Sequence, residues 1–209
     1  MKKLLIILLF LAAPFVIAQT LKQEDLNVYV THTQSLFASK VSGFDQVDLR
    51  NTRAVYIKED GRKGEWQALK RGRGRTDYTT HYGVYQGGEE VELDWWHLLD
   101  PTHVVVAYLW TEWYGSSSQF EVVQVFELRN DKVFITQQIE ADTQGGGTAA
   151  GAWFNQGIKR LTVKAVELDS PKGRCCPTHI NIVAFRWDGR KFRQIRARQA
   201  RMPLDKFGR

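Results

Sequence analysis

Two adjacent cysteines, Cys175 and Cys176, are the first residues in this sequence whose types suggest chemistry, and Pro177 follows them directly. They are the only cysteines in the chain. A disulfide between neighbours closes a strained ring, because ordinary disulfides hold the two Cα atoms about 4.4–6.8 Å apart and a trans peptide fixes them at about 3.8 Å. Such a bond is easier to reduce than an ordinary structural disulfide. Pro177 favours an extended or turned backbone at Cys176.

Four interpretations of the cysteine pair are open at this point. The pair can form a vicinal disulfide that clamps a loop, which is what an oxidising compartment favours. It can also be two reduced, buried thiols that pack as small apolar side chains. A soft-metal site with His179 as a third ligand lacks the usual C-x-x-C spacing. A redox switch needs exposed thiols with a lowered pKa. We predict the vicinal disulfide.

A glycine-rich stretch is the second candidate, with Gly145, Gly146 and Gly147 in succession and Gly151 soon after. Such a loop cradles a phosphate when a strand precedes it and a helix N-terminus follows it. The match to that pattern is weak here, so we expect a turned loop that interrupts the β pattern. Beside Trp153, this loop is a candidate border of a ligand groove.

Basic residues are concentrated in two stretches, and we consider both as contacts for an anionic partner. The first comprises Arg71, Arg73 and Arg75, and the second comprises Arg193, Arg196, Arg198 and Arg201. From Arg186 to Arg209 the chain has nine Lys or Arg and two Asp. Phospholipid headgroups, lipopolysaccharide, acidic wall polymers or another envelope protein fit such charge, whereas export argues against nucleic acid. The alternative is a solvated stretch, including a basic tail from about residue 197.

The remaining signals predict neither an active site nor a bound cofactor. The sequence has no G-x-S-x-G, H-E-x-x-H, P-loop or EF-hand pattern. His97 and His103 flank a segment whose spacing fits no standard zinc site, so we expect surface or hydrogen-bonded histidines. We therefore predict no catalytic residues, no metal and no cofactor.

The first residues predict export. Lys2 and Lys3 precede an unbroken apolar run from Leu4 to Ala13, and small residues precede Gln19. This pattern is typical of a secretory signal peptide over residues 1–18, with cleavage between Ala18 and Gln19. We expect a periplasmic or extracellular protein whose residues 19–209 form a single β-rich domain.

The elements that must position these residues are mainly strands, because apolar alternation and turn dipeptides dominate the chain. Asp60-Gly61 and Asp188-Gly189 predict two-residue hairpin turns in which both positions have positive φ. The segment His103–Glu112 is apolar on both faces, which indicates a central strand covered on both sides. The apolar phase changes within Gln119–Leu128, and a β-bulge is a plausible cause. We predict a mainly β fold: an antiparallel meander forming a sandwich or partial barrel, with few short helices.

The stretch GRCCPTHINIVAFRWDGRKF resembles the C-terminal signature of exported bacterial proteins related to the LppP/LprE-like lipoproteins. The matching residues are Cys175, Cys176, Pro177, Arg186, Trp187, Asp188, Gly189 and Phe192. The resemblance covers roughly the last third of the chain. It implies an exported protein and brings no known reaction with it.

Two functions are therefore expected from the sequence. The first is a non-enzymatic envelope or extracellular module that binds or has a structural role, with peripheral membrane contact as one mode. The alternative is a small periplasmic hydrolase or thiol-redox protein whose site lies near the glycine-rich loop and the vicinal cysteines.

Overall fold

The computed structural model describes residues 26, 28–34, 42–57, 63–79, 85–113, 117–143, 150–166 and 179–201. The predicted leader (1–18), the glycines 145–147 and the cysteines 175–176 lie outside these residues. Within the described part of the chain, no helix is long and apolar enough to cross a membrane.

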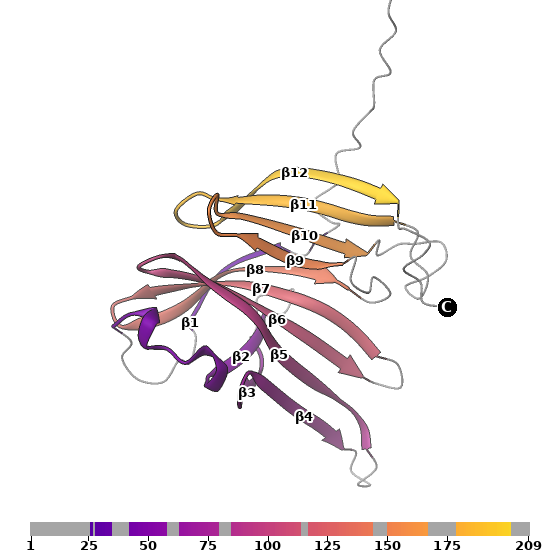
Figure 1. Ribbon diagram of the computed structural model, residues 1–209. Helices are drawn as coiled ribbons and strands as arrows, with labels where there is room; N and C mark the ends of the chain where they lie inside the picture. Colours follow the sequence, from indigo (N-terminus) through magenta and orange to yellow (C-terminus); the bar gives the residue numbers. More distant parts are fainter. Residues whose placement is uncertain are drawn as a thin grey trace, which may run out of the picture.

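A six-stranded antiparallel sheet forms the centre of the molecule (Figure 1). Five of its strands follow one another in a meander, and the first strand of the chain pairs with the last of them. Its strands are β1 (Val28–Gln34), β4 (Arg73–Thr79), β5 (Tyr85–Asp100), β6 (His103–Trp113), β7 (Ser117–Arg129) and β8 (Lys132–Asp142).

Two smaller sheets complete the fold. The chain after β8 forms a four-stranded antiparallel meander, with β9 (Gly151–Asn155), β10 (Arg160–Val166), β11 (His179–Trp187) and β12 (Phe192–Arg201). The chain before β4 contains the 3-10 turns η2 (Phe44–Gln46) and η3 (Leu49–Asn51), and the hairpin of β2 (Arg53–Ile57) and β3 (Lys63–Ala68).

The central sheet is covered on both faces, and strand β6 shows this most clearly. Val105 and Ala107 pack in the core shared with the four-stranded sheet. Val104 and Val106 pack on the opposite face against the hairpin β2–β3 and the two 3-10 turns. Because residues of a strand alternate between faces, both sets are buried only if both faces are covered. The predicted covered strand is confirmed, and so is the mainly β, sandwich-like antiparallel fold.

The change of phase expected in Gln119–Leu128 does not occur, because both faces of this strand are buried. Val122 faces one core and Val123 the other, so strand β7 keeps one alternation throughout. The ladder is irregular at Val125 and Phe126, where the extra residue belongs to β8: Val125 pairs with Gln137 and Phe126 with Ile135. Thr136 is therefore the bulged residue.

Two glutamines of β8 attach the outer layers to the central sheet. The amide of Gln137 accepts from Phe192 N at 2.7 Å and donates to Phe192 O at 3.0 Å. On the other face, Gln138 accepts from Ile57 N at 3.1 Å and donates to Ile57 O at 2.9 Å. Each side chain pairs with a backbone as a further strand would. Gln137 thereby fixes the start of β12 and the turn before it.

The hairpin turns only partly follow the dipeptide prediction. Asn130 and Asp131 both have positive φ, so they form the two-residue turn between β7 and β8. At the β11–β12 turn only Gly189 has positive φ, and the loop extends over residues 188–191. The expected two-residue turn is therefore wrong there, although the hairpin exists. Asp60-Gly61 lies outside the described residues, while the strands that flank it do pair.

Two predictions about the C-terminal third are corrected by the four-stranded sheet. The break expected around the glycines ends sooner than we expected, because Gly151–Asn155 forms β9 and pairs with β10. The basic tail expected from about residue 197 is part of a strand up to Arg201, which pairs with His179. Charged residues hid this strand because β12 is an edge strand with one solvated face.

Candidate anion-binding site

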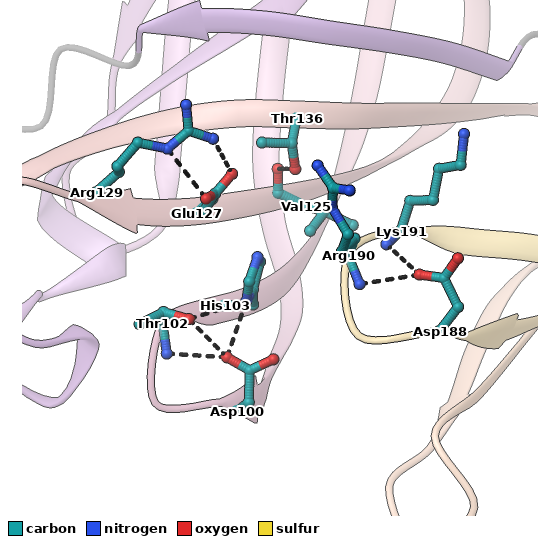
Figure 2. Close-up of polar contacts among 10 residues, drawn as sticks. All are labelled: Asp100, Thr102, His103, Val125, Glu127, Arg129, Thr136, Asp188, Arg190 and Lys191. Carbon is teal, nitrogen blue, oxygen red and sulfur yellow. Dashed lines mark hydrogen bonds and ion pairs between the residues drawn. The ribbon is translucent and has the colours of Figure 1, made fainter.

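A pocket of about 320 Å³ lies where three turns from different parts of the sequence meet. The β5–β6 turn contributes His103, and strands β7 and β8 contribute residues next to their own turn. The four-residue β11–β12 turn closes the remaining side (Figure 2). The described residues that line it are His103, Glu127, Arg129, Thr136, Asp188, Arg190, Lys191 and Arg193.

The β5–β6 turn is ordered by one carboxylate, which also fixes the histidine. Asp100 Oδ1 accepts from Thr102 N at 2.9 Å and from Thr102 Oγ1 at 3.0 Å. The same oxygen lies 2.8 Å from His103 Nδ1, so Nδ1 carries a proton and Nε2 is left for other contacts. Burial alone raises the pKa of Asp100, but the contacts with His103 and Thr102 outweigh this and lower it.

The wall formed by β7 and β8 contains an ion pair beside the bulge. Arg129 donates to Glu127 through Nε at 3.1 Å and through Nη2 at 2.7 Å. Thr136 donates to Val125 O at 3.3 Å. As the bulged residue it is directed toward the pocket instead of following the strand alternation.

The β11–β12 turn is built around Asp188. Its Oδ1 accepts from Arg190 N and Lys191 N, each at 2.9 Å, and its Oδ2 accepts from the Arg193 guanidinium. Burial raises the pKa of Asp188, but these hydrogen bonds and the nearby positive charge outweigh it and hold the pKa at about 2. Asp188 is therefore ionised at neutral pH. Its backbone contacts direct the Arg190 and Lys191 side chains away from their own turn, as Figure 2 shows.

The charges that line the pocket do not cancel. Glu127 is bonded to Arg129 and Asp188 to Arg193. Among the described residues, the Arg190 guanidinium and the Lys191 ammonium have no hydrogen-bond or ion-pair partner, so two positive charges remain. A concave site with an excess of hydrogen-bond donors and positive charge suits an oxyanion such as phosphate, sulfate or carboxylate.

The geometry favours binding over acid–base chemistry. A catalytic acid or base works best with a pKa near the operating pH. In this pocket the pKa of Asp188 is lowered, because its surroundings stabilise the charged carboxylate as in an ion pair. The one hydroxyl among the described lining residues, Thr136, already donates to the backbone. No group of three metal-ligating side chains occurs in the described part of the chain.

The structure brings few of the sequence-predicted site residues together. Arg193 lines the pocket, while Arg196, Arg198 and Arg201 continue along β12. Arg73 and Arg75 lie on β4, far from β12 in Figure 1, and they pair with Glu92 and Asp77. Arg71 is exposed in the turn before β4, where its backbone N–H donates to Asn51.

The aromatic candidate also lies away from the pocket. Trp153 is 44% exposed on β9, and Lys164 Nζ lies 4.7 Å from its ring centroid. The other members of the expected ligand groove, Gly145, Gly146 and Gly147, are outside the described residues, as are Cys175 and Cys176. The groove and the disulfide stay predictions.

Sequence reasoning missed His103, Arg129, Arg190 and Lys191 as site residues. The only available signal was the pair Arg190-Lys191 directly after the predicted Asp188-Gly189 turn, because residues beside a turn are exposed. Within the C-terminal signature, Trp187 packs edge-on against Phe192 with centroids 5.4 Å apart and also against His103 at 5.1 Å. These residues hold the two sides of the pocket together.

The chain matches no protein-family model, and comparisons with curated proteins and with solved structures also give no match.

Proposed function

We propose that this protein is an exported, non-enzymatic binding module that holds an anionic group of an envelope component in the pocket at the β11–β12 turn. The observation that carries the proposal is the charge balance of that pocket. Each lining carboxylate is bonded to an arginine, and the Arg190 and Lys191 side chains have no partner among the described residues. The export part of the proposal rests on the apolar leader predicted over residues 1–18.

The pocket is suited to its ligand before the ligand arrives. Asp188 fixes the turn by accepting hydrogen bonds from two backbone amides, and a hydrogen bond to Gln137 attaches the first residue of β12 to the central sheet. Only the ends of two side chains must be ordered on binding, which limits the entropic cost. Arg190 offers a planar fork for two oxygens, and Lys191 adds a point charge.

The test is a calorimetric titration of the purified protein with inorganic phosphate at low ionic strength. We expect Arg190→Ala/Lys191→Ala to weaken binding about tenfold or more, because hydrogen bonds to charged groups contribute about 1.5–3 kcal/mol each. The matched control, Arg53→Ala/Lys70→Ala, removes two exposed charges from the opposite layer and should bind as the unmodified protein does. Equal weakening in both variants would show only a general charge effect and would overturn the proposal.

The alternative of a hydrolase or thiol-redox site depends on residues 145–147 and 175–176. No described residue favours it, so it is not proposed.

A further inference from the structure

The outer face of the four-stranded sheet carries an unusual row of arginines. Leu161 and Phe185 lie in the core between the sheets, so their neighbours Arg160 and Arg186 lie on the face directed away from the central sheet. Arg160 pairs with Arg186 across the ladder, and Arg186 pairs with Arg193. Three arginines on three adjacent strands are thus directly opposite one another.

No acidic residue on these strands neutralises this row. Strands β9 to β12 contain no Asp or Glu, and they contain seven Lys or Arg. Three further cations lie on the same face. Lys164 and Arg198 both pair with Ile182, one from each side, and Arg196 pairs with Ala184. Among the described residues, only Arg193 of the row is paired with a carboxylate, Asp188. Arg160 Nε is buried without a hydrogen-bond partner.

Such a row costs stability in the free protein, because like charges directly opposite each other on a sheet repel. An anionic partner removes this cost. Arginine, more than lysine, presents a fork that matches oxyanions. Neighbouring strands lie about 4.8 Å apart, so the backbones of the three arginines follow one another at about this interval. That spacing suits a chain that carries an oxyanion on each short repeating unit.

The row is continuous with the anion-binding pocket, because Arg193 belongs to both. Toward the other end, the same face becomes apolar and is buried, with Val166 fully covered and Ile180 6% exposed. The accessible basic surface is therefore the part of this face that lies next to the pocket.

We propose that the protein binds a linear polyanion, with one oxyanion in the pocket and the following ones on the row Arg160–Arg186–Arg193. This inference rests on the proposed function and specifies its ligand class: a flexible polymer with repeated phosphate-like groups, and not a single small anion. The exposed large apolar side chains of this sheet, Trp153 on β9 and Ile195 on β12, lie outside the arginine row. The row itself therefore matches a polyanion better than a lipid bilayer.

The test compares inorganic phosphate, tripolyphosphate and a long polyphosphate as probes of one chemistry and increasing length. We expect affinity to rise with length, and the salt dependence to steepen because more charges are neutralised. Arg160→Gln/Arg186→Gln should bind inorganic phosphate as the unmodified protein does and lose about tenfold or more of its affinity for long polyphosphate. Arg53→Gln/Lys70→Gln is the charge-matched control and should retain the length effect.

The outcomes separate the two proposals. If phosphate binds in the pocket but affinity does not depend on length, the polyanion inference is wrong and the proposed function stands. If the Arg190→Ala/Lys191→Ala variant binds phosphate normally, the proposed function fails. Binding to phosphatidylglycerol vesicles without binding to polyphosphate would overturn the inference in favour of a membrane surface. A stability measurement guards against misfolding, since relief of repulsion should leave the melting temperature of Arg160→Gln/Arg186→Gln unchanged or higher.

Discussion

Glu121 is a buried carboxyl at the interface between the two larger sheets. Glu121 is only 4% exposed, and its Oε2 accepts a hydrogen bond from Ala152 N at 2.6 Å. Oε1 has no hydrogen-bond partner. Burial raises the pKa of Glu121 to about 7, the Ala152 amide partly offsets this, and the charge of Asp94 adds to the increase. The folded protein therefore holds this proton to a higher pH than the unfolded chain does.

Because of Glu121, we expect the folded protein to become less stable as the pH rises. The pKa is higher in the folded protein than its ordinary 4.5, so between about pH 4.5 and 7 the unfolded chain releases this proton while the folded chain keeps it. The contribution of Glu121 to the free energy of unfolding is complete below about pH 4.5 and has fallen by about 3 kcal/mol at pH 7. Glu121→Gln keeps an acceptor for Ala152 N and should be more stable than the unmodified protein at pH 7.

The measurement is urea unfolding at several pH values. The difference between the unmodified protein and Glu121→Gln isolates this group from Asp94, whose pKa is also raised. Asp131→Asn, an acid-to-amide change at an exposed residue of the β7–β8 turn, should follow the unmodified curve. Parallel curves for Glu121→Gln and the unmodified protein would contradict the assignment.

Strand β8 is the element on which the three layers depend. Its neighbouring residues Gln137 and Gln138 face opposite cores because successive side chains of a strand point to opposite faces, and the ladder is regular again after the bulge at Thr136. Gln138 also accepts from Gln124 at 2.7 Å, and Gln124 donates to Val55 O at 2.7 Å. A buried backbone group that loses its partner costs about 1–3 kcal/mol. The glutamines therefore make layer attachment specific as well as stable.

We predict that Gln138→Met lowers the free energy of unfolding by about 3 kcal/mol, because it removes the hydrogen-bond partner of Ile57 N and of Ile57 O and leaves the Gln124 amide with Val55 O alone. Methionine keeps the chain length and apolar contact. Chemical denaturation followed by tryptophan fluorescence provides the measurement. Gln119→Met, an exposed position on β7, is the matched control and should change stability little. Equal stability of the two variants would show that the Gln138 bonds are not needed.

Strand β12 gives a second test at the level of elements. Because Ala197 to Arg201 pair with β11 and Ala197 packs against the core, a chain that ends at Arg196 should unfold at a lower temperature than one that ends at Arg201. The comparison is made by thermal denaturation followed by circular dichroism. Identical melting temperatures would mean that these residues act as a solvated tail after all.

At the level of the whole molecule, charge and layers are arranged together. Acidic residues cluster on the central sheet, where Glu89, Glu90, Glu92 and Asp94 all lie on β5. The strands of the C-terminal sheet carry only basic charges. The pocket lies at the junction of these two sheets, so its shape depends on how they dock. The net positive charge of the pocket attracts anions from solution and speeds their encounter.

Properties that depend on near neighbours could be predicted from the sequence alone. Alternation identified most strands, and the strand now labelled β6 was expected to be buried on both faces. Such signals are local, because side-chain direction and turn conformation depend on a few adjacent residues. The short strand β9 escaped detection because glycine dominates the stretch before it. The end of β12 escaped because an edge strand can be entirely polar on its open face.

Which distant residues lie side by side depends on how the sheets pair and pack. The pocket joins His103, Arg129 and Arg190 from three turns far apart in the sequence, and the arginine row exists only through the register of β10, β11 and β12. Whether Gln137 is solvated or bonded to Phe192 likewise depends on the docking of two sheets. Pairing between distant strands is set by the combined burial of many side chains, and no short stretch of sequence contains that information.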